Sequence, residues 1–216
     1  RMAIPVFEER GINAPLAEAV KRAVHIPVTS VGGYTDPTLM ERFLEEGKCD
    51  GFVLGRSILA DPQLPTKART GRTEEIHQCL RCFVCNNAQY HNRGKVLRCA
   101  INPCAGREFT IRTVPASPKR KILVAGGGCG GMEAAITAVQ RGHDVVLYEK
   151  SGQLGGWLNM ERHLPFKLDM YNYARALEHE CKVYGVKVIL NTAVTPEIVA
   201  QERPDTLICA IGSETV

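Results

Sequence analysis

The chain has 216 residues, of which 44% are hydrophobic and 23% charged, with a formal net charge of +4. This composition is typical of a folded globular protein and excludes a fibrous or wholly disordered chain. The charge is too small and too evenly spread to indicate a nucleic-acid partner, and no run approaches the ~20 apolar residues that span a membrane. Nine cysteines, an odd number, favour a reducing, cytoplasmic location over a disulfide framework.

The segment over residues 1–75 alternates helices with short apolar strands. Apolar residues at helical spacing predict a helix over residues 14–24, and a short apolar run predicts a buried strand over residues 28–31. A second helix is predicted to begin after the N-cap Asp36, and a second strand is predicted over residues 52–54. This βα alternation predicts an α/β fold.

Glycine follows both of these strands. Gly32 and Gly33 follow the first strand, and Gly55 with Arg56 follows the second. Glycine lets backbone N–H groups approach an anion, and arginine adds a fixed positive charge. The pattern is typical of the phosphate site of a (β/α)8 barrel, on the loops after strands seven and eight, although ordinary glycine turns are the alternative. Two strands cannot close a barrel, so the rest of such a barrel is expected before Arg1.

The middle of the chain holds a dense group of thiols. Cys79, Cys82 and Cys85 are each three residues from the last, and Cys99 follows after a loop. The C-x2-C-x2-C run fits three ligands of a [4Fe–4S] cluster, with Cys99 as the fourth and Cys104 as the alternative fourth ligand. Structural zinc is a rival, although zinc sites usually take two ligands from each of two knuckles. Free or redox-active thiols are a further alternative.

A proline-containing stretch over residues 111–118 is typical of a domain boundary. Beyond it, the apolar strand KILVA over residues 121–125 leads into a glycine-rich turn. The turn satisfies G-x-G-x-x-G at Gly126, Gly128 and Gly131. On its own this motif is weak, and it indicates a nucleotide site only between a strand and a helix.

The motif stands in the required strand–turn–helix–strand context. A helix is predicted over residues 132–141, and a strand over residues 144–148 ends at Glu149. This context predicts that a pyrophosphate binds at the helix N-terminus, with a βαβ unit without nucleotide as the alternative. An acidic residue accepts ribose hydroxyls and disfavours a 2′-phosphate, so the ligand is FAD, NAD or ADP rather than NADP. The glycine pair Gly155 and Gly156 lets the chain pass close to a cofactor and favours FAD.

The end of the chain continues the alternation. A helix is predicted over residues 168–184, with strands over residues 186–190 and 205–210. The chain stops directly after the last of these strands, so the nucleotide-binding domain is expected to be incomplete.

Several pieces of the chain, in order, resemble the flavin oxidoreductases that join an old-yellow-enzyme barrel to a disulfide-reductase-like domain. Known branches are the 2,4-dienoyl-CoA reductases, the clostridial-type enoate reductases and trimethylamine dehydrogenase. The matching pieces are IPVTSVGGYTDP, DGFVLGRSILADPQLPTKARTGR, CLRCFVC, LRCAINPCAGRE, KILVAGGGCGGMEAA and LYEKSGQLGGWL. Many relatives have three residues between the second and third cysteines. Here two intervene, which is closer to the trimethylamine dehydrogenase pattern.

The resemblance implies three parts: the last βα units of an FMN-binding (β/α)8 barrel over residues 1–75, an iron–sulfur segment and linker over residues 76–118, and an incomplete Rossmann-like FAD-binding domain over residues 119–216. It implies that the FMN phosphate is held by Gly32, Gly33, Gly55 and Arg56. It implies that the [4Fe–4S] ligands are Cys79, Cys82, Cys85 and Cys99. The implied contacts of FAD, or of ADP in its place, are Gly126, Gly128, Gly131, Glu149, Lys150 and Gly156.

The implied activity is that of an NAD(P)H-dependent flavin oxidoreductase. In it, electrons pass from NAD(P)H through FAD, the cluster and FMN to the activated C=C bond of an enoate or dienoyl-CoA substrate. An amine dehydrogenase of the trimethylamine dehydrogenase type and a non-enzymatic, zinc-stapled nucleotide-binding module are the alternatives. No catalytic residue is named, because the residues that protonate and orient substrate are expected before Arg1, and the nicotinamide site is expected beyond Val216. The chain is therefore expected to be an inactive piece of a longer protein, and homo-oligomer formation stays open.

Overall fold

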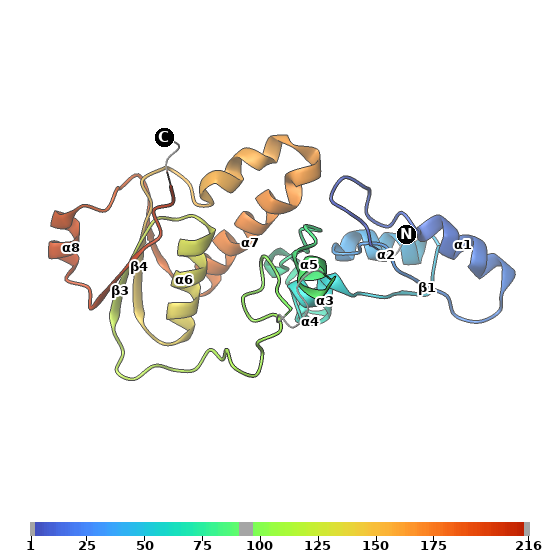
Figure 1. Cartoon of the computed structure of the whole chain (residues 1–216), viewed down its shortest axis with the longest axis horizontal. Helices are drawn as coiled ribbons and strands as arrows, with labels where there is room; N and C mark the ends of the chain where they lie inside the picture. The colour runs from blue at the N-terminus through green and yellow to red at the C-terminus, as the bar shows by residue number, and fades with distance from the viewer. Residues whose placement is uncertain (1–2, 91–96, 214–216) are drawn as a thin grey trace. The chain divides into compact units, whose positions relative to one another are not determined.

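The computed structural model describes residues 3–90 and 97–213 of the chain (Figure 1). The chain divides into two compact units, Arg1–Ile111 and Arg112–Val216, and each has its own hydrophobic core. The cysteine-rich segment belongs to the first unit. Both units contain parallel β-strands connected through helices, which confirms the predicted α/β class.

The first unit begins with two βα repeats and continues in short helices. Its elements are α1 (Ala14–Ala23), β1 (Thr29–Ser30), α2 (Pro37–Glu45), β2 (Gly51–Phe52), α3 (Arg56–Ala60), α4 (Leu64–Arg69), the 3₁₀ turn η1 (Thr73–Glu75) and α5 (Val84–Tyr90). The strands β1 and β2 pair in parallel, with Thr29 opposite Gly51 and Ser30 opposite Phe52. Their carboxyl ends therefore lie at the same edge, which is where the predicted glycine segments follow.

The core of the first unit forms around Tyr34. Its ring centroid lies 6.2 Å from that of Phe43 and 4.5 Å from that of Phe52. The prediction of an N-cap is confirmed at α2, where an oxygen of Asp36 accepts a hydrogen bond of 2.9 Å from the backbone N–H of Thr38.

The larger apolar side chains within α1, whose spacing predicted the helix, are exposed rather than buried. Leu16 is 65% exposed and Val20 is 51% exposed. The helix instead buries Ala14 and Ala17 against the unit. The larger apolar side chains of α1 thus form a surface that the described residues do not cover.

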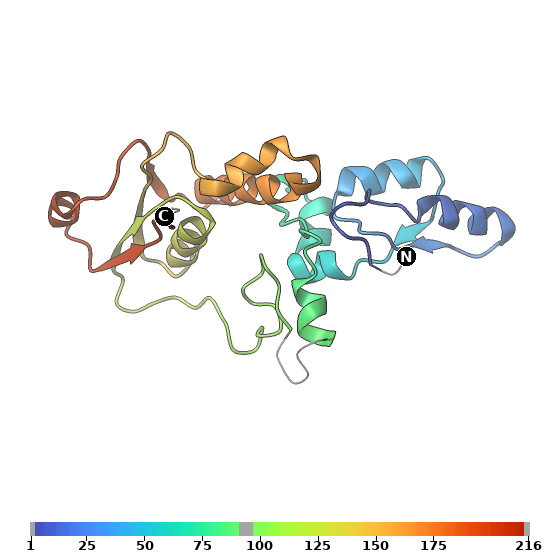
Figure 2. The same ribbon diagram turned by 45° about the horizontal axis from the view of Figure 1, so that its top comes forward.

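The second unit is a parallel sheet flanked by helices. Its elements are β3 (Lys121–Ala125), α6 (Cys129–Gln140), β4 (Asp144–Tyr148), the 3₁₀ segments η2 (Gly156–His163) and η3 (Pro165–Lys167), α7 (Leu168–Val183), β5 (Lys187–Ile189), α8 (Pro196–Glu202) and β6 (Thr206–Cys209). The strand order is β5-β4-β3-β6, and all three pairings are parallel. Figures 1 and 2 show α6 and α7 on one face of this sheet and α8 on the other. Leu123 and Leu147, in the two central strands, are fully buried.

The predicted strands over residues 121–125 and 144–148 are confirmed. The helix between them begins at Cys129 rather than at residue 132, so the third glycine of the motif lies inside its first turn. The short helices α4, α5 and α8 carry too few turns to show a periodic pattern and were not predicted. Among the described residues, no helix is both long enough and apolar enough to cross a bilayer.

Candidate functional site

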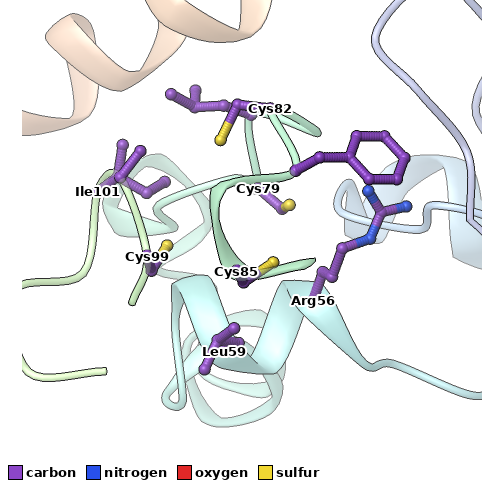
Figure 3. Close-up of a pocket in the computed structure, with 10 residues that line it drawn as sticks. Arg56, Leu59, Cys79, Cys82, Cys85, Cys99 and Ile101 are labelled. Atoms are coloured by element: carbon purple, nitrogen blue, oxygen red, sulfur yellow. The ribbon is translucent and has the colours of Figure 1, made fainter. Parts of the chain in front are cut away.

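The four cysteines predicted as cluster ligands line a single pocket of the first unit. The pocket has about 300 Å³ of empty space, part of it open to solvent, and is lined by Arg56, Leu59, Cys79, Leu80, Cys82, Phe83, Cys85, Cys99, Ala100 and Ile101. Figure 3 shows the side chains of the four cysteines arranged around this space. Cys99 thus reaches the pocket from a remote part of the sequence, whereas Cys104 lies outside the lining.

The cysteine hook, defined as residues 79–85, has an unusual backbone. Arg81 and Phe83 have φ angles of 53° and 61°, a left-handed conformation that residues other than glycine rarely adopt. Such conformations persist where the surrounding structure fixes them, and they concentrate at functional sites. Here the backbone N–H of Arg81 donates a hydrogen bond of 3.4 Å to Sγ of Cys79. The side chain of Arg81 donates to the backbone oxygens of Pro5 and Glu8.

The pocket makes free thiolates unfavourable. Burial raises the pKa of the Cys79 thiol, an effect that the hydrogen bond from Arg81 and the charge of Arg56 partly oppose. Burial likewise raises the pKa of the Cys85 thiol, against the backbone hydrogen bond from Asn86 and the Arg56 charge. Thiolates in such surroundings need a compensating cation, and a metal supplies one because it binds the deprotonated form. In the part of the chain that the structure describes, no three His, Cys, Asp or Glu side chains form a group that could hold a metal ion.

Arg56 connects the predicted phosphate segment with the cysteine pocket. It is the first residue of α3 and lines the pocket beside Cys79 and Cys85. Its guanidinium carbon lies 4.7 Å from the ring centroid of Phe83, within cation–π range. Its Nη2 donates a hydrogen bond of 2.9 Å to the backbone oxygen of Ile4.

The residues predicted to hold a phosphate in the first unit lie on neighbouring segments. Gly32 and Gly33 follow β1, and Gly55 stands directly before α3. The hydroxyl of Ser57 donates to the backbone oxygen of Tyr34, and this hydrogen bond ties the first turn of α3 to the segment after Gly33. The structure therefore brings the two glycine segments together, while their role in binding FMN stays a prediction.

In the second unit, the predicted glycine turn lies between β3 and α6. Gly126 has a φ of 107°, and a Cβ atom there would stand 2.3 Å from the backbone oxygen of Ala210. A Cβ atom on Gly131 would stand 1.8 Å from the backbone oxygen of Gly126, so α6 packs directly on the turn. These are the roles that the first and third glycines have in a dinucleotide-binding motif.

Glu149 closes this turn from the end of β4. Its carboxylate accepts hydrogen bonds of 2.6 Å from the backbone N–H of Gly127 and 2.8 Å from that of Ser151. Burial alone would raise the pKa of the Glu149 carboxyl, but these hydrogen bonds and the nearby charge of Lys150 outweigh burial and hold the pKa below its ordinary value. Glu149 is therefore ionised at neutral pH and already anchored before any ribose is bound.

The second glycine pair is held against the first. The backbone N–H of Gly155 donates to the oxygen of Gly127 at 2.8 Å, and a Cβ atom on Gly156 would stand 3.3 Å from Cα of Gly128. On the other side, Nη2 of Arg175 donates to the backbone oxygen of Leu154 at 2.6 Å. The two glycine segments thus form one surface over the N-terminus of α6.

Sequence reasoning missed three residues that shape these sites. Phe83 and Arg81 carry no motif of their own, and only their place between ligand-like cysteines could have singled them out. Arg175 lies in a helix about 20 residues after the loop that it holds, and no local pattern indicates such a contact.

Comparisons with known proteins give matches in both units of the chain. Residues 5–75 match the NADH:flavin oxidoreductase / NADH oxidase family, and residues 121–200 match the FAD dependent oxidoreductase family. The NADH oxidase of Thermoanaerobacter brockii is 40% identical over 210 residues, which cover 96% of this chain and 32% of that protein.

Solved structures extend the likeness to the whole fold. A 2-naphthoyl-CoA reductase in complex with 2-naphthoyl-CoA superposes with a TM-score of 0.94 at 32% identity, over 99% of this chain and 33% of that one. A histamine dehydrogenase from Rhizobium sp. 4-9 superposes with a TM-score of 0.88 at 28% identity, over 98% of this chain and 31% of that one. The chain therefore spans about a third of the length of these relatives. From these matches, residues 5–75 belong to the NADH:flavin oxidoreductase / NADH oxidase family and residues 121–200 to the FAD dependent oxidoreductase family.

Proposed function

We propose that this chain is part of an oxidoreductase that uses NAD(P)H to reduce the activated C=C bond of an enoate or dienoyl-CoA substrate, with FMN, FAD and a [4Fe–4S] cluster as its cofactors. When bound, the flavins supply hydride chemistry and the cluster supplies one-electron steps between them. The proposal divides the chain into the end of an FMN barrel (residues 1–75), a cluster segment (residues 76–118) and part of a Rossmann-like FAD domain (residues 119–216).

The observation that carries the proposal is the shared pocket of Cys79, Cys82, Cys85 and Cys99. A cube of iron and sulfide is wider than a single ion, so its four ligands surround a space rather than converge on a point. Four thiols around an otherwise apolar pocket that also contains Arg56 suit that group. The residues that would hold it are the four cysteines, with the backbone N–H of Arg81 as a hydrogen-bond donor to one sulfur.

The two flavin sites are proposed from the residues on either side of this pocket in the sequence. Gly32, Gly33, Gly55 and Arg56 would hold the FMN phosphate.

The turn around Gly128 would leave backbone N–H groups free for a pyrophosphate at the N-terminus of α6, a helix of 12 residues. Glu149 would orient the ribose through its remaining lone pairs, and the carbonyl-bound Arg175 would keep the second glycine pair in place. The similarity to a 2-naphthoyl-CoA reductase supports an electron-poor, conjugated substrate.

The test is chemical analysis and turnover of the complete protein, purified without oxygen. Iron and acid-labile sulfide in equal amounts, together with FMN and FAD, are expected. NADH oxidation should then be coupled to reduction of a 2-enoate or its CoA thioester. Mass spectrometry identifies the reduced product. Amine-driven reduction of an acceptor, with no enoate reduction, would indicate the dehydrogenase alternative. Stoichiometric zinc without sulfide would indicate the zinc-stapled module.

A further inference from the structure

We propose that Arg56, beyond its predicted contact with a phosphate, is the fixed positive charge that raises the reduction potential of the group held by the four cysteines. The inference rests on the proposed function, because it takes that group to be a [4Fe–4S] cluster. Arg56 would act on the cluster through its charge and not as a ligand.

Among the described residues that line the pocket, Arg56 is the one permanent cation. The other residues that line the pocket are the four cysteines and five apolar side chains. An arginine stays protonated under all ordinary conditions. In apolar surroundings its charge is poorly screened, so its effect on a neighbouring redox group is stronger than at an open surface.

The guanidinium is held in place from two sides. Its Nη2 donates to the backbone oxygen of Ile4 at 2.9 Å, and its carbon lies 4.7 Å from the ring centroid of Phe83. Phe83 belongs to the cysteine hook and has a φ of 61°, which is unfavourable for an aromatic residue. The hook thus keeps a strained residue in the position that contacts the cation.

A second guanidinium nitrogen of Arg56 lacks an acceptor among the described residues. Its Nη1 is buried and has no hydrogen-bond partner among the described residues. A buried N–H without an acceptor is costly, and a charged one more so. An electron-rich acceptor in this region, such as the sulfur of a cluster or the oxygen of a phosphate, would satisfy it.

Reduction of a cluster adds one negative charge to the pocket. A fixed cation stabilises the reduced form more than the oxidised form, so it makes the cluster easier to reduce. Net charge and hydrogen bonds to the sulfurs are the means by which a protein sets such a potential. Removal of the Arg56 charge should therefore lower the potential while the four thiolate ligands remain.

The test is a redox titration of the loaded holoprotein, monitored by electron paramagnetic resonance, with iron, sulfide and FMN measured in each sample. Arg56→Gln is expected to disfavour cluster reduction on the order of tenfold, which is about 59 mV for one electron. Arg56→Lys keeps the charge and should retain most of the potential. Arg69→Gln removes an exposed charge of α4 outside the pocket and should leave the potential unchanged.

Loss of FMN needs its own control, because Arg56 is also predicted to contact the FMN phosphate. Wild-type holoprotein stripped of FMN shows what loss of that cofactor alone does to the potential. If FMN-free wild-type protein has a potential as low as that of Arg56→Gln, the inference is overturned.

A second variant covers the case in which Arg56→Gln fails to assemble a cluster. Phe83→Leu keeps an apolar side chain but removes the ring that holds the guanidinium, and it should lower the potential in the same direction. An unchanged potential in a cluster-containing Arg56→Gln or Phe83→Leu protein overturns the inference and leaves the proposed function standing. Absence of iron and sulfide from the wild-type protein would instead overturn the proposed function itself.

Discussion

Glu149 joins the end of β4 to the glycine turn through both carboxylate oxygens, which accept from Gly127 and Ser151. The predicted partner of Glu149, a ribose, would thus meet a carboxylate that is already oriented. Two charge-assisted hydrogen bonds hold it there, each stronger than a bond between neutral groups. Substitution of this residue should therefore weaken the second unit even when no cofactor is bound.

Glu149→Gln is expected to lower the free energy of unfolding by about 1–3 kcal/mol near neutral pH, because the amide brings an N–H group against two backbone donors. The folded-state pKa of Glu149 lies below its ordinary value. The stabilisation is therefore fully present above the unfolded value of about 4.3 and is lost as pH falls through the folded pKa. Denaturant unfolding at several pH values checks this, since the wild-type and variant curves should converge only below about pH 4.

Asp144→Asn is the matched control, because Asp144 is exposed at the other end of the same strand. It should change stability little at any pH. A difference between wild type and Glu149→Gln that stays constant down to strongly acidic pH would refute the assigned role of the charge.

Among the short elements of the first unit, α4 contains one partner of a buried ion pair that also contacts the segment just before the cysteine hook. Asp61 and Lys67 are 4% and 9% exposed, and Nζ of Lys67 lies 2.8 Å from Oδ2 of Asp61. The same carboxylate oxygen accepts from the backbone N–H of His77 at 3.1 Å. The segment that leads into Cys79 is thus positioned by a contact 16 residues away in the sequence.

Asp61→Asn should destabilise the first unit by about 3–5 kcal/mol, because it leaves the buried charge of Lys67 without its counter-ion. Chemical denaturation followed by a probe in this unit measures the effect. The control is Glu46→Gln, which breaks an exposed pair with Lys48 and should change stability far less, because solvent screens an exposed pair. Equal effects of the two substitutions would show that the buried pair has no special role.

On the scale of the whole chain, the cysteine pocket joins two segments that are far apart in the sequence. Cys79, Cys82 and Cys85 come from the hook, and Cys99 comes from a later segment, which Asn102 anchors by a hydrogen bond of 2.8 Å to the backbone oxygen of Leu59. A cluster bound by all four thiolates would therefore link these segments and stabilise the first unit when it binds.

Cys99→Ser should reduce bound iron and sulfide sharply and increase amide hydrogen exchange in residues 79–87, because one of the four anchors is lost. Cys104→Ser is the matched control. It removes a nearby thiol that does not line the pocket, and the cluster content should stay at the wild-type level. Loss of the cluster from Cys104→Ser, with Cys99→Ser fully loaded, would reverse the proposed ligand set.

Features that depend on neighbouring residues could be predicted from the sequence alone. The strand–glycine–helix–strand unit from Lys121 to Tyr148 could be predicted because local propensity, glycine positions and apolar periodicity all agree there. The spacing of the first three cysteines likewise indicated a hook, since it is a short-range pattern. Family membership followed from the order of such pieces and was confirmed by the comparisons.

Contacts between distant groups became visible only in the folded chain. Spacing favoured Cys99 over Cys104 as the fourth thiol, but only the folded chain shows that Cys99 lines the pocket and that Arg56 lies over the ring of Phe83. It also could not show that Leu16 and Val20 stay exposed in α1, because burial depends on which other segments pack against a helix. These outcomes follow from contacts between residues far apart in the chain, and a one-dimensional pattern carries no information on which of several similar side chains the fold will turn inward.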